Sequence, residues 1–271
     1  MTDDLETLRS ETQRIWDAKA EHWDSQMGEG NQFQQVLVGP SSERLLMIQP
    51  GETILDLACG NGVFSRRLAA LGARVVATDF SQRFLELARA RPSEHADQIE
   101  YRQADATDEA ALLALGERRF DAVVCNMAIQ DMPTIEPLLR AVSRLLKPDG
   151  RFVFTLPHPA FNVPTASQLL LEETDRDGRL EERLAVKLFG YVDVPPAKGV
   201  GMIGEPEAHY YFHRPLNVLL GACFTAGFVL DGLEEPHFGP EDTSRRRPLG
   251  WGNFKQIPPV LAARLRLAQQ V

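Results

Sequence analysis

The sequence predicts an α/β protein with a doubly wound, mostly parallel sheet. Short apolar runs alternate with segments of helical periodicity from residue 53 to residue 156, which is typical of parallel strands joined by helices. The first run passes directly into the glycine-bearing stretch Cys59–Gly62. Asp56 and Asp79 lie at the ends of successive runs, and open parallel sheets bind ligands at that edge.

The elements can be predicted in order. Trp16 and Trp23 share one face of a helix expected over 5–27. Each later strand is a short apolar run, and each helix repeats apolar residues at three- and four-residue spacing. Lys147–Gly150 ends the last of these helices with a proline and a glycine. The expected strands are 53–57, 74–78, 99–102, 120–125 and 151–156, and the expected helices are 41–48, 62–71, 82–90, 108–115 and 134–146.

Residues 157–214 interrupt this rhythm with prolines and glycines. Segments of this length without regular structure are usually lids or binding loops. The rhythm returns with a helix over 215–226 and a strand over 228–234. Residues 260–267 fit a last strand, but their leucines and alanines are also good helix formers, so both interpretations stay open. We expect an N-terminal helix and lid (1–40), a core (41–156 and 215–271) and a cap (157–214).

Composition argues against several classes of function. The chain has 271 residues and a net charge of −9, whereas a nucleic-acid binder needs a basic face. Its basic run, Arg245–Arg247, is expected to be a solvated loop. No apolar stretch reaches the ~20 residues of a membrane span, and the acidic N-terminus does not resemble a signal peptide. Cys59, Cys125 and Cys223 lack metal-ligand spacing, which favours reduced thiols in the cytoplasm and no bound metal.

The glycine loop indicates a ligand that contains a nucleoside. Gly60 and Gly62 let the backbone approach a ligand closely. Asp79 follows Gly60 by 19 residues, where an acid can hold both hydroxyls of a ribose. A dinucleotide loop would add a third small residue and set a pyrophosphate on the helix N-terminus. Asp56 would lie badly beside a pyrophosphate and suits a ligand with an ammonium and a sulfonium.

Asp56–Gly62 (DLACGNG) resembles motif I, [DE]-x-x-x-G-x-G, of the class I S-adenosylmethionine-dependent methyltransferases. The overall pattern is similar to the ubiquinone-biosynthesis-like enzymes that methylate small molecules. The resemblance implies a seven-stranded Rossmann-like sheet, closed by a late strand pair, and S-adenosylmethionine as cofactor. Four later motifs extend it over about residues 50–156: Asp79–Ser81 after the second strand, Ala104–Ala106 after the third, Asn126–Gln130 after the fourth, and Leu146–Gly150, with Asp149 in place of a glycine, before the fifth.

The resemblance also implies the residues that bind the cofactor. Asp79 would hold the ribose while Ser81 caps the next helix. Asp105 would accept a hydrogen bond from the adenine amine, and Phe80 would either stack on adenine or fill the core. The full set is Asp56, Ala58, Gly60, Gly62, Asp79, Phe80, Asp105, Ala106 and Asn126.

The resemblance carries no catalytic residue, because this superfamily places its chemistry in variable caps. Methyl transfer mainly needs an acceptor held in line, and an O or N acceptor can also need a base. Either His158, directly after the fifth strand, or His213, at the end of the insertion, is predicted to contact the acceptor and take its proton. A packing role for each histidine, or an acceptor that needs no base, is the alternative.

Aromatic residues gather in the predicted cap and on the first helix. We expect them to line an apolar pocket for a small molecule, although a small core under the cap would use the same residues. The expected substrate-facing residues are Trp23, Asn31, Gln130, Tyr191, Tyr210 and Tyr211.

The predicted function is methyl transfer from S-adenosylmethionine to a small-molecule acceptor. The expected form is a cytoplasmic monomer or homodimer, with neither nucleic acid nor a membrane as partner. One alternative is an enzyme that uses the cofactor otherwise, for cyclisation or carboxymethyl transfer. Another is a regulatory protein that binds the cofactor without catalysis. The glycine loop and the lack of a catalytic Tyr/Lys pattern disfavour an NAD-dependent oxidoreductase.

Overall fold

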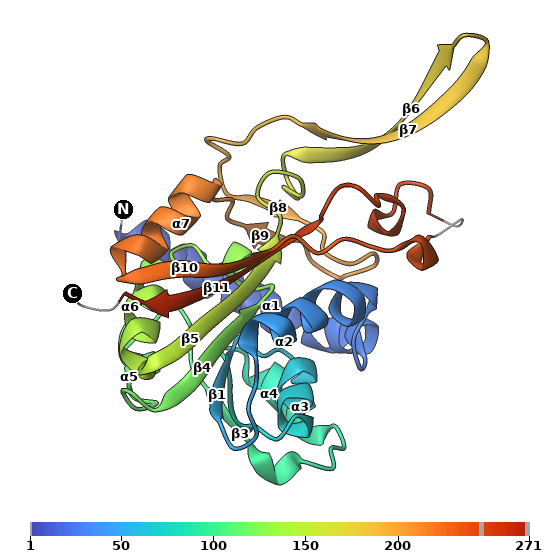
Figure 1. Ribbon diagram of the computed structural model, residues 1–271. Helices are drawn as coiled ribbons and strands as arrows, with labels where there is room; N and C mark the ends of the chain where they lie inside the picture. Colours follow the sequence, from blue (N-terminus) through green and yellow to red (C-terminus); the bar gives the residue numbers. More distant parts are fainter. Residues whose placement is uncertain (1, 244–246, 269–271) are drawn as a thin grey trace.

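The computed structural model describes residues 2–243 and 247–268. Its centre is a seven-stranded sheet in the order β10-β11-β5-β4-β1-β2-β3 (Figure 1). Strand β11 runs antiparallel between β5 and β10, and β1 to β5 pair in parallel, which confirms the predicted fold class. The strands are β1 (Thr53–Leu57), β2 (Arg74–Asp79), β3 (Ile99–Gln103), β4 (Phe120–Asn126), β5 (Leu146–Pro157), β10 (Phe228–Glu234) and β11 (Val260–Leu267).

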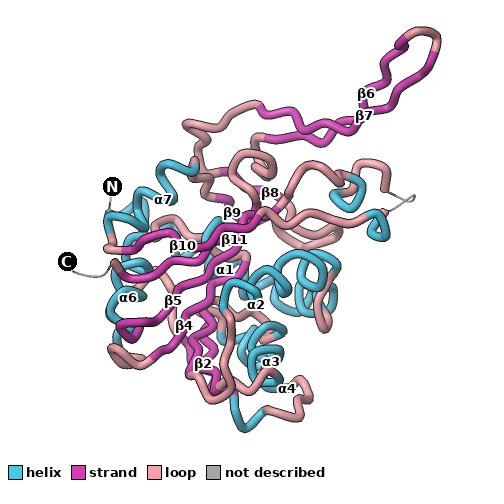
Figure 2. Tube along the Cα trace, in the orientation of Figure 1, coloured by secondary structure: helices cyan, strands magenta, loops and turns pink. Residues whose placement is uncertain are grey.

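Helices cover both faces of this sheet (Figure 2). Helices α5, α6 and α7 bury leucines in one apolar core, and α2 and α3 bury theirs in a second core on the other face. Side-chain caps start two helices: Ser81, as predicted, accepts a hydrogen bond from the Phe84 amide, and Asp108 accepts from the amides of Ala110 and Ala111. The helices are α2 (Gly39–Leu46), α3 (Val63–Ala70), α4 (Gln82–Ala90), α5 (Glu109–Leu113), α6 (Glu136–Leu145) and α7 (Leu216–Thr225).

The N-terminal helix α1 (Thr2–Met27) packs on the carboxyl edge of the sheet. Its Trp16 ring lies 6.2 Å from the Phe84 ring of α4. Its Gln13 amide donates to the Phe80 carbonyl, just after β2, at 3.0 Å. A π-helix, Phe33–Val38, follows and joins α1 to α2. These contacts place α1 over the edge where the predicted site residues lie.

Two sequence ambiguities are resolved by pairing in the sheet. Residues 260–267 form a strand, because β5 and β10 pair with both of their edges and bury Val260 to Ala263; this tertiary context outweighs their helix propensity. Strand β5 begins earlier than predicted, at Leu146. Its register against β4 jumps from Phe120↔Leu146 to Ala122↔Arg151, so the predicted turn at 147–150 is retained as a bulge.

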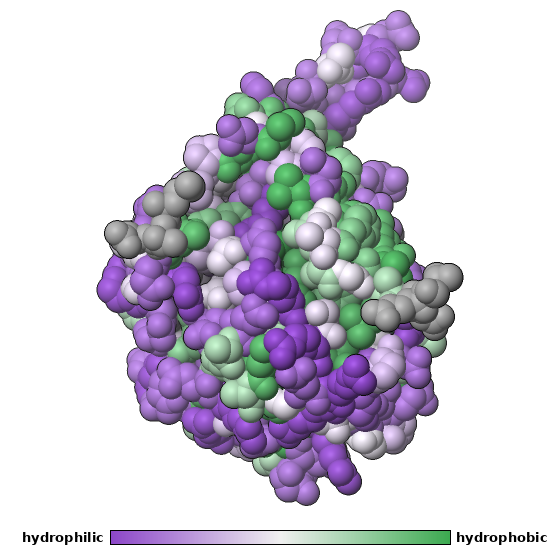
Figure 3. All heavy atoms as spheres, turned by 90° about the vertical axis from the view of Figure 1, so that its left-hand side faces the viewer, coloured by the Kyte–Doolittle hydropathy of each residue, from purple (hydrophilic) through white to green (hydrophobic). Residues whose placement is uncertain are grey.

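The insertion contains a long hairpin that the prediction of an irregular cap misses. Strands β6 (Ser167–Arg176) and β7 (Arg179–Leu188) pair along their whole length and extend away from the body (Figures 1 and 2). Asp177 and Gly178 both have positive φ, and an Asp-Gly pair between extended runs is a strong hairpin signal. Figure 3 shows this arm covered mostly by hydrophilic residues. The rest of the insertion pairs β8 (Ala197–Gly199) with β9 (His209–Tyr211).

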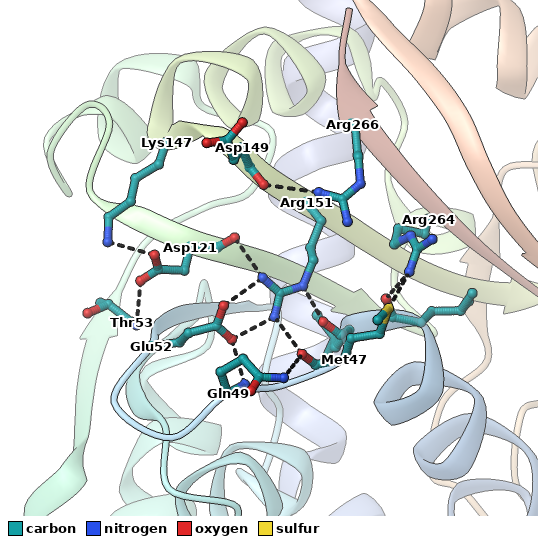
Figure 4. A network of polar contacts seen from close by, with 12 residues as sticks. Met47, Gln49, Glu52, Thr53, Asp121, Lys147, Asp149, Arg151, Arg264 and Arg266 are labelled. Carbon is teal, nitrogen blue, oxygen red and sulfur yellow. Dashed lines mark hydrogen bonds and ion pairs between the residues drawn. The ribbon is translucent and has the colours of Figure 1, made fainter.

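A polar network fastens the opposite, amino-terminal edge of the sheet (Figure 4). The buried Arg151 guanidinium of β5 binds both Glu52 carboxylate oxygens, at 2.8 and 2.6 Å, and donates to the Leu46 carbonyl at the end of α2. Asp121, next to the start of β4, accepts from Lys147 and from the Thr53 amide. Charged groups thus join α2, β1, β4 and β5 away from the predicted site.

Candidate functional site

A cavity of about 500 Å³ lies at the carboxyl edge of the sheet. The ends of β1, β2, β4 and β5 form its floor, α1 forms one wall, and the insertion forms another. The residues that contribute from these parts include Asp56, Ala58, Gly60, Asp79, Asp105, Asn126 and Pro157 from the core, Arg9, Thr12, Trp16 and Trp23 from α1, and Asn162, Val200, Met202, His209 and Tyr211 from the insertion.

The two glycines of the loop have different reasons to be glycine. Both have positive φ, +55° at Gly60 and +74° at Gly62, a region that L side chains rarely adopt. A Cβ on Gly60 would meet no atom within 4 Å and would extend into open space, whereas a Cβ on Gly62 would lie 2.6 Å from the Tyr101 hydroxyl. Gly60 therefore leaves room for a ligand, and Gly62 permits close packing of α3.

Asp79 organises the loop and keeps capacity for a ligand. Its two carboxylate oxygens accept from the Gly60 amide at 2.8 Å and from the Ser81 amide at 2.9 Å. A carboxylate has about four acceptor sites, so each oxygen can accept one more hydrogen bond. Burial raises the pKa of Asp79 to about 6, against the effect of these two amides. Burying the charged carboxylate is thus energetically unfavourable, and hydrogen bonds from ribose hydroxyls would stabilise the charge.

Asp56 lies on the floor of the same end of the cavity. Burial raises the pKa of its carboxyl to about 7, although the Ser65 hydroxyl donates to it at 2.5 Å. Asn126, at the end of β4, accepts from Ser42 and Thr155 through Oδ1, while its buried Nδ2 has no partner among the described residues. The floor therefore offers an acid and an unused amide donor to a ligand.

Asp105 is held in place by its own turn and by α1. Its Oδ1 accepts from the Thr107 amide and hydroxyl, each at 2.7 Å, and its Oδ2 accepts from Arg9 at 2.9 Å. Phe80 and Ala106 line the cavity beside it. The positions predicted to surround the adenine are therefore brought together.

One wall of the cavity is aromatic. Trp16 and Trp23 pack edge to face at 4.9 Å, and the His209 ring lies 4.8 Å from Trp16 and 4.5 Å from Tyr211. All four residues line the cavity. Such a wall suits an apolar or aromatic ligand.

A buried polar cluster stands behind this wall. The Lys19 ammonium, over the Trp16 ring, binds Glu205 at 3.1 Å and makes a short contact to His209 Nδ1. His209 Nε2 faces Asp131 Oδ1 at 3.7 Å. Burial, with the nearby Lys19 charge, lowers the pKa of His209 to about 3, so the imidazole is neutral.

The insertion fixes this cluster against β4. The Phe212 amide, just after β9, donates to the Gln130 carbonyl at 2.7 Å. The half-buried Arg214 guanidinium donates to the carbonyls of Ile129 and Met132 on either side of Asp131. Asp131 and His209 therefore have fixed relative positions although 78 residues separate them in the chain.

Most of the predicted site residues line the cavity, but not all. Gly62 lies behind the loop, against Tyr101. Tyr210 donates its hydroxyl to Glu11, and the Tyr191 hydroxyl accepts from the Leu216 amide. The predicted residues that line the cavity are Asp56, Ala58, Gly60, Asp79, Phe80, Asp105, Ala106 and Asn126 for the cofactor, and Trp23, Asn31, Gln130 and Tyr211 for the substrate.

The structure does not bring His158 or His213 to the cavity wall. His158 Nδ1 accepts from the Ala160 amide, and its Nε2 lies 2.8 Å from Glu235. His213 Nε2 lies 2.7 Å from the Tyr191 carbonyl. These nitrogens already have partners, which fits the packing alternative, and a role as base remains a prediction for mutagenesis.

Sequence reasoning missed Lys19, Asp131 and Glu205 as site residues, and it did not select His209, the histidine that opens the aromatic stretch of the insertion. Lys19 offers a signal, because it lies between Trp16 and Trp23 on the apolar stripe of α1, where a charge needs a buried partner. Asp131 follows the recognised motif after β4 by one residue. The sequence does not reveal that the segment before His209 folds onto both.

Comparison with known proteins agrees with this geometry. A family model described as a methyltransferase domain matches residues 55–154. The chain is 44% identical over 103 residues to a demethylmenaquinone methyltransferase of Clavibacter sepedonicus, and 37% identical over 107 residues to a ubiquinone biosynthesis O-methyltransferase of Xanthomonas oryzae pv. oryzae. These matches cover 38% and 39% of this chain, and only 40% and 44% of the relatives' length.

A solved structure extends the likeness over most of the chain. It is an S-adenosylmethionine-dependent methyltransferase from Mesorhizobium loti, with a TM-score of 0.64 and 26% identity, and the match covers 84% of this chain and 96% of that one. Within the described residues, no helix is long and apolar enough to cross a membrane. Residues 55–154 thus match a methyltransferase domain, and the chain has the fold of an S-adenosylmethionine-dependent methyltransferase.

Proposed function

We propose that this protein binds S-adenosylmethionine and transfers its methyl group to a small-molecule acceptor. The observation that carries the proposal is the open space at Gly60 beside Asp79, which retains free acceptor capacity. The cofactor's chemistry fits these groups: Asp79 would accept from the ribose hydroxyls, Asp105 would lie near the adenine, and Asp56 and Asn126 would lie near the amino-acid end. When bound, the cofactor supplies an electrophilic methyl group on a sulfonium.

The chain's own residues would hold the acceptor and exclude water. We propose that α1 with residues 28–40, and the insertion 157–214, form a cap, because both contribute to the cavity wall. Positioning within such a closed site can contribute roughly 7–11 kcal/mol of the barrier. The aromatic wall of Trp16, Trp23 and Tyr211 favours an acceptor with an apolar or aromatic body. The two curated relatives are named for demethylmenaquinone and for ubiquinone biosynthesis.

The same proposal includes a cytoplasmic location and a monomer or homodimer. The three cysteines are unpaired, which fits a reducing compartment. Light scattering of the purified protein measures the oligomeric state, and fractionation of cells measures the location.

Calorimetry with S-adenosylhomocysteine tests the cofactor. Asp79→Ala should weaken its binding by about 1–3 kcal/mol, because the ribose hydroxyls lose their acceptor. Glu234→Gln, which changes a surface carboxylate paired with Arg44, is the control and should leave the affinity unchanged. Tight binding of NAD in place of S-adenosylhomocysteine would overturn the proposal.

Product analysis separates methyl transfer from other uses of the cofactor. Mass spectrometry of turnover mixtures should show S-adenosylhomocysteine and an acceptor heavier by one methylene unit. Methylthioadenosine or a carboxymethylated product would support the alternative chemistry instead.

A further inference from the structure

Two buried acceptors in the cavity wall lack a hydrogen-bond partner among the described residues. They are Gln130 Oε1 and Asp131 Oδ1, on adjacent side chains. The other Asp131 oxygen accepts from Gln130 Nε2 at 3.0 Å. The nearest facing donor to Asp131 Oδ1, His209 Nε2, is 3.7 Å away, too far for a hydrogen bond. Since an unpartnered buried acceptor is unfavourable, this wall has a place for a donor from a ligand.

Lys19 decides which nitrogen of His209 carries the proton. An ammonium has donors only, so Lys19 donates to His209 Nδ1, and the ring proton of the neutral imidazole lies on Nε2. That N–H faces Asp131 Oδ1. The cavity therefore presents one donor and one acceptor side by side, and Lys19 and Glu205 are positioning residues behind them.

A hydroxyl group complements this pair, because it has one proton to donate and two lone pairs. We propose that Asp131 and His209 bind the methyl acceptor by a hydroxyl group, and that Asp131 takes the hydroxyl proton during transfer. The inference rests on the proposed function and names its substrate class, an aromatic or otherwise apolar alcohol or phenol. An ammonium would offer no lone pair to His209, and a carboxylate would bring no proton to Asp131 and would be repelled by it.

The step balances in atoms and charge. A lone pair of the acceptor oxygen attacks the methyl carbon, and the new O–C bond forms as the C–S bond breaks. The bonding pair goes to sulfur, which becomes a neutral thioether. The hydroxyl proton goes to the Asp131 carboxylate and then to solvent when the product leaves. His209 keeps its Nε2 proton throughout.

The surroundings of Asp131 suit a base. Burial raises the pKa of its carboxyl well above the ordinary value, and the Lys19 charge and the Gln130 hydrogen bond only partly oppose this. A carboxylate with a raised pKa is a stronger proton acceptor, so the rate should increase with pH as Asp131 ionises. The charged and titratable groups that face it are Lys19 of α1, Glu205 before β9, His209 and Tyr211 of β9, and Cys125 of β4.

Binding of simple probes tests the recognition step without a known substrate. Phenol, toluene, aniline and benzoate are titrated, by NMR, into the protein saturated with S-adenosylhomocysteine. We expect phenol to bind about tenfold more tightly than toluene, because only phenol satisfies Asp131, and benzoate to bind least. Asp131→Leu should abolish the preference for phenol, and the isosteric Asp131→Asn should keep it in part. Glu234→Gln, at a surface carboxylate that pairs with Arg44 away from the cavity, is the control and should keep the full preference.

Each other outcome counts against the inference. Equal binding of phenol and toluene, stronger binding of aniline, or no binding of phenol overturns it while leaving the cofactor site intact. A preference that persists in Asp131→Leu also overturns it. If S-adenosylhomocysteine itself fails to bind, the proposed function is overturned and this inference with it.

Turnover of a hydroxylated acceptor tests the proton transfer. Asp131→Asn should lower kcat about 10²–10⁴-fold, with a smaller change in KM and an unchanged affinity for S-adenosylhomocysteine. The variant should also lose the rise of kcat with pH. A wild-type pH profile retained by Asp131→Asn would show that another group takes the proton.

Discussion

At the scale of single residues, the two glycines of the loop have different roles: one leaves space for a ligand, and the other allows close packing. Gly60 and Gly62 have similar left-handed backbone conformations, yet an added methyl group would meet empty space at one and the Tyr101 hydroxyl at the other. The sequence motif requires glycine at both positions and does not distinguish their roles. The structure predicts that a substitution at one glycine impairs ligand binding and a substitution at the other impairs stability.

We predict that Gly60→Ala and Gly62→Ala have opposite main effects. Gly60→Ala should cost only the backbone strain of about 1–2 kcal/mol in stability, but it should strongly weaken binding of S-adenosylhomocysteine. Gly62→Ala should lower the free energy of unfolding by more than Gly60→Ala, because the strain adds to a steric overlap. Urea unfolding and calorimetry measure the two quantities. Equal stability losses would contradict the packing role of Gly62.

We predict that cofactor binding weakens in acid because Asp79 must be ionised to accept from ribose. With its pKa near 6, affinity for S-adenosylhomocysteine should fall by up to about tenfold per pH unit below that value. The effect of pH on the stability of the protein without ligand has the opposite direction. Asp79 and Asp56 have pKa values raised above those of the unfolded chain, so at these two groups the native state without ligand binds more protons, and their contribution to stability should rise as pH falls from about 7 towards 4.

Calorimetry between pH 5 and 8 checks the binding part of this prediction. Asp79→Asn is the control, and its weaker binding should depend much less on pH in that window. An affinity of the wild-type protein that stays constant from pH 7 to 5 would show that Asp79 is not the group that binds the ribose.

At the scale of elements, the β6–β7 hairpin is separate from the chemistry. It does not line the cavity, and it extends beyond the cap (Figure 1). A two-stranded hairpin is at best marginally stable by itself, so this arm contributes little to the stability of the domain. The part of the insertion that matters for the cavity is the return through β9.

We predict that shortening the arm leaves the core intact. Replacing residues 169–186 by Asn-Gly keeps the paired ends of β6 and β7 and supplies a two-residue turn. The free energy of unfolding should change by less than about 1 kcal/mol, and S-adenosylhomocysteine should bind as before. A loss of cofactor affinity, measured by calorimetry, would place the arm in the cofactor site.

At the scale of the whole molecule, the carboxyl and amino edges of the sheet differ in their contributions to binding and stability. The carboxyl edge carries the cavity, where buried acids with raised pKa values make the native state less stable at neutral pH. The amino edge carries the Arg151 network, in which Arg151 pairs with Glu52 and Lys147 pairs with Asp121 (Figure 4). Burial acts to raise the pKa of Glu52, but Arg151 and the Gln49 amide outweigh it, so the pKa lies below its ordinary value. This network is present at neutral pH and weakens as acid protonates Glu52.

We predict that Arg151→Leu destabilises the fold without altering the site. It leaves the mostly buried Glu52 carboxylate without its main partner, which should cost roughly 3 kcal/mol. The double variant with Glu52→Gln should recover part of this loss. Urea unfolding measures stability, and calorimetry under folding conditions should show unchanged affinity for S-adenosylhomocysteine. A stability loss below about 1 kcal/mol would show that the network contributes little.

The sheet, its helices and the edge of the sheet that carries the candidate site could be predicted from the sequence alone. These follow from local causes: apolar periodicity, Ser81 and Asp108 as caps, and glycines that only a tight loop tolerates. The same local causes predicted the Asp56, Gly60 and Asp79 cluster, because the ends of neighbouring parallel strands must meet.

Other features depend on contacts between distant parts of the chain. Residues 260–267 became a strand because two partners were available for pairing, a contact that propensity does not contain. In the sequence, His158 and His213 lie next to segments that end at the carboxyl edge of the sheet. The direction of their side chains, however, depends on how the cap folds. Their nitrogens contact Glu235 and the Tyr191 carbonyl instead of facing the cavity. Asp131 and His209 lie close together because hydrogen bonds join the end of β9 to the turn after β4. No local sequence pattern encodes a contact between residues so far apart in the chain.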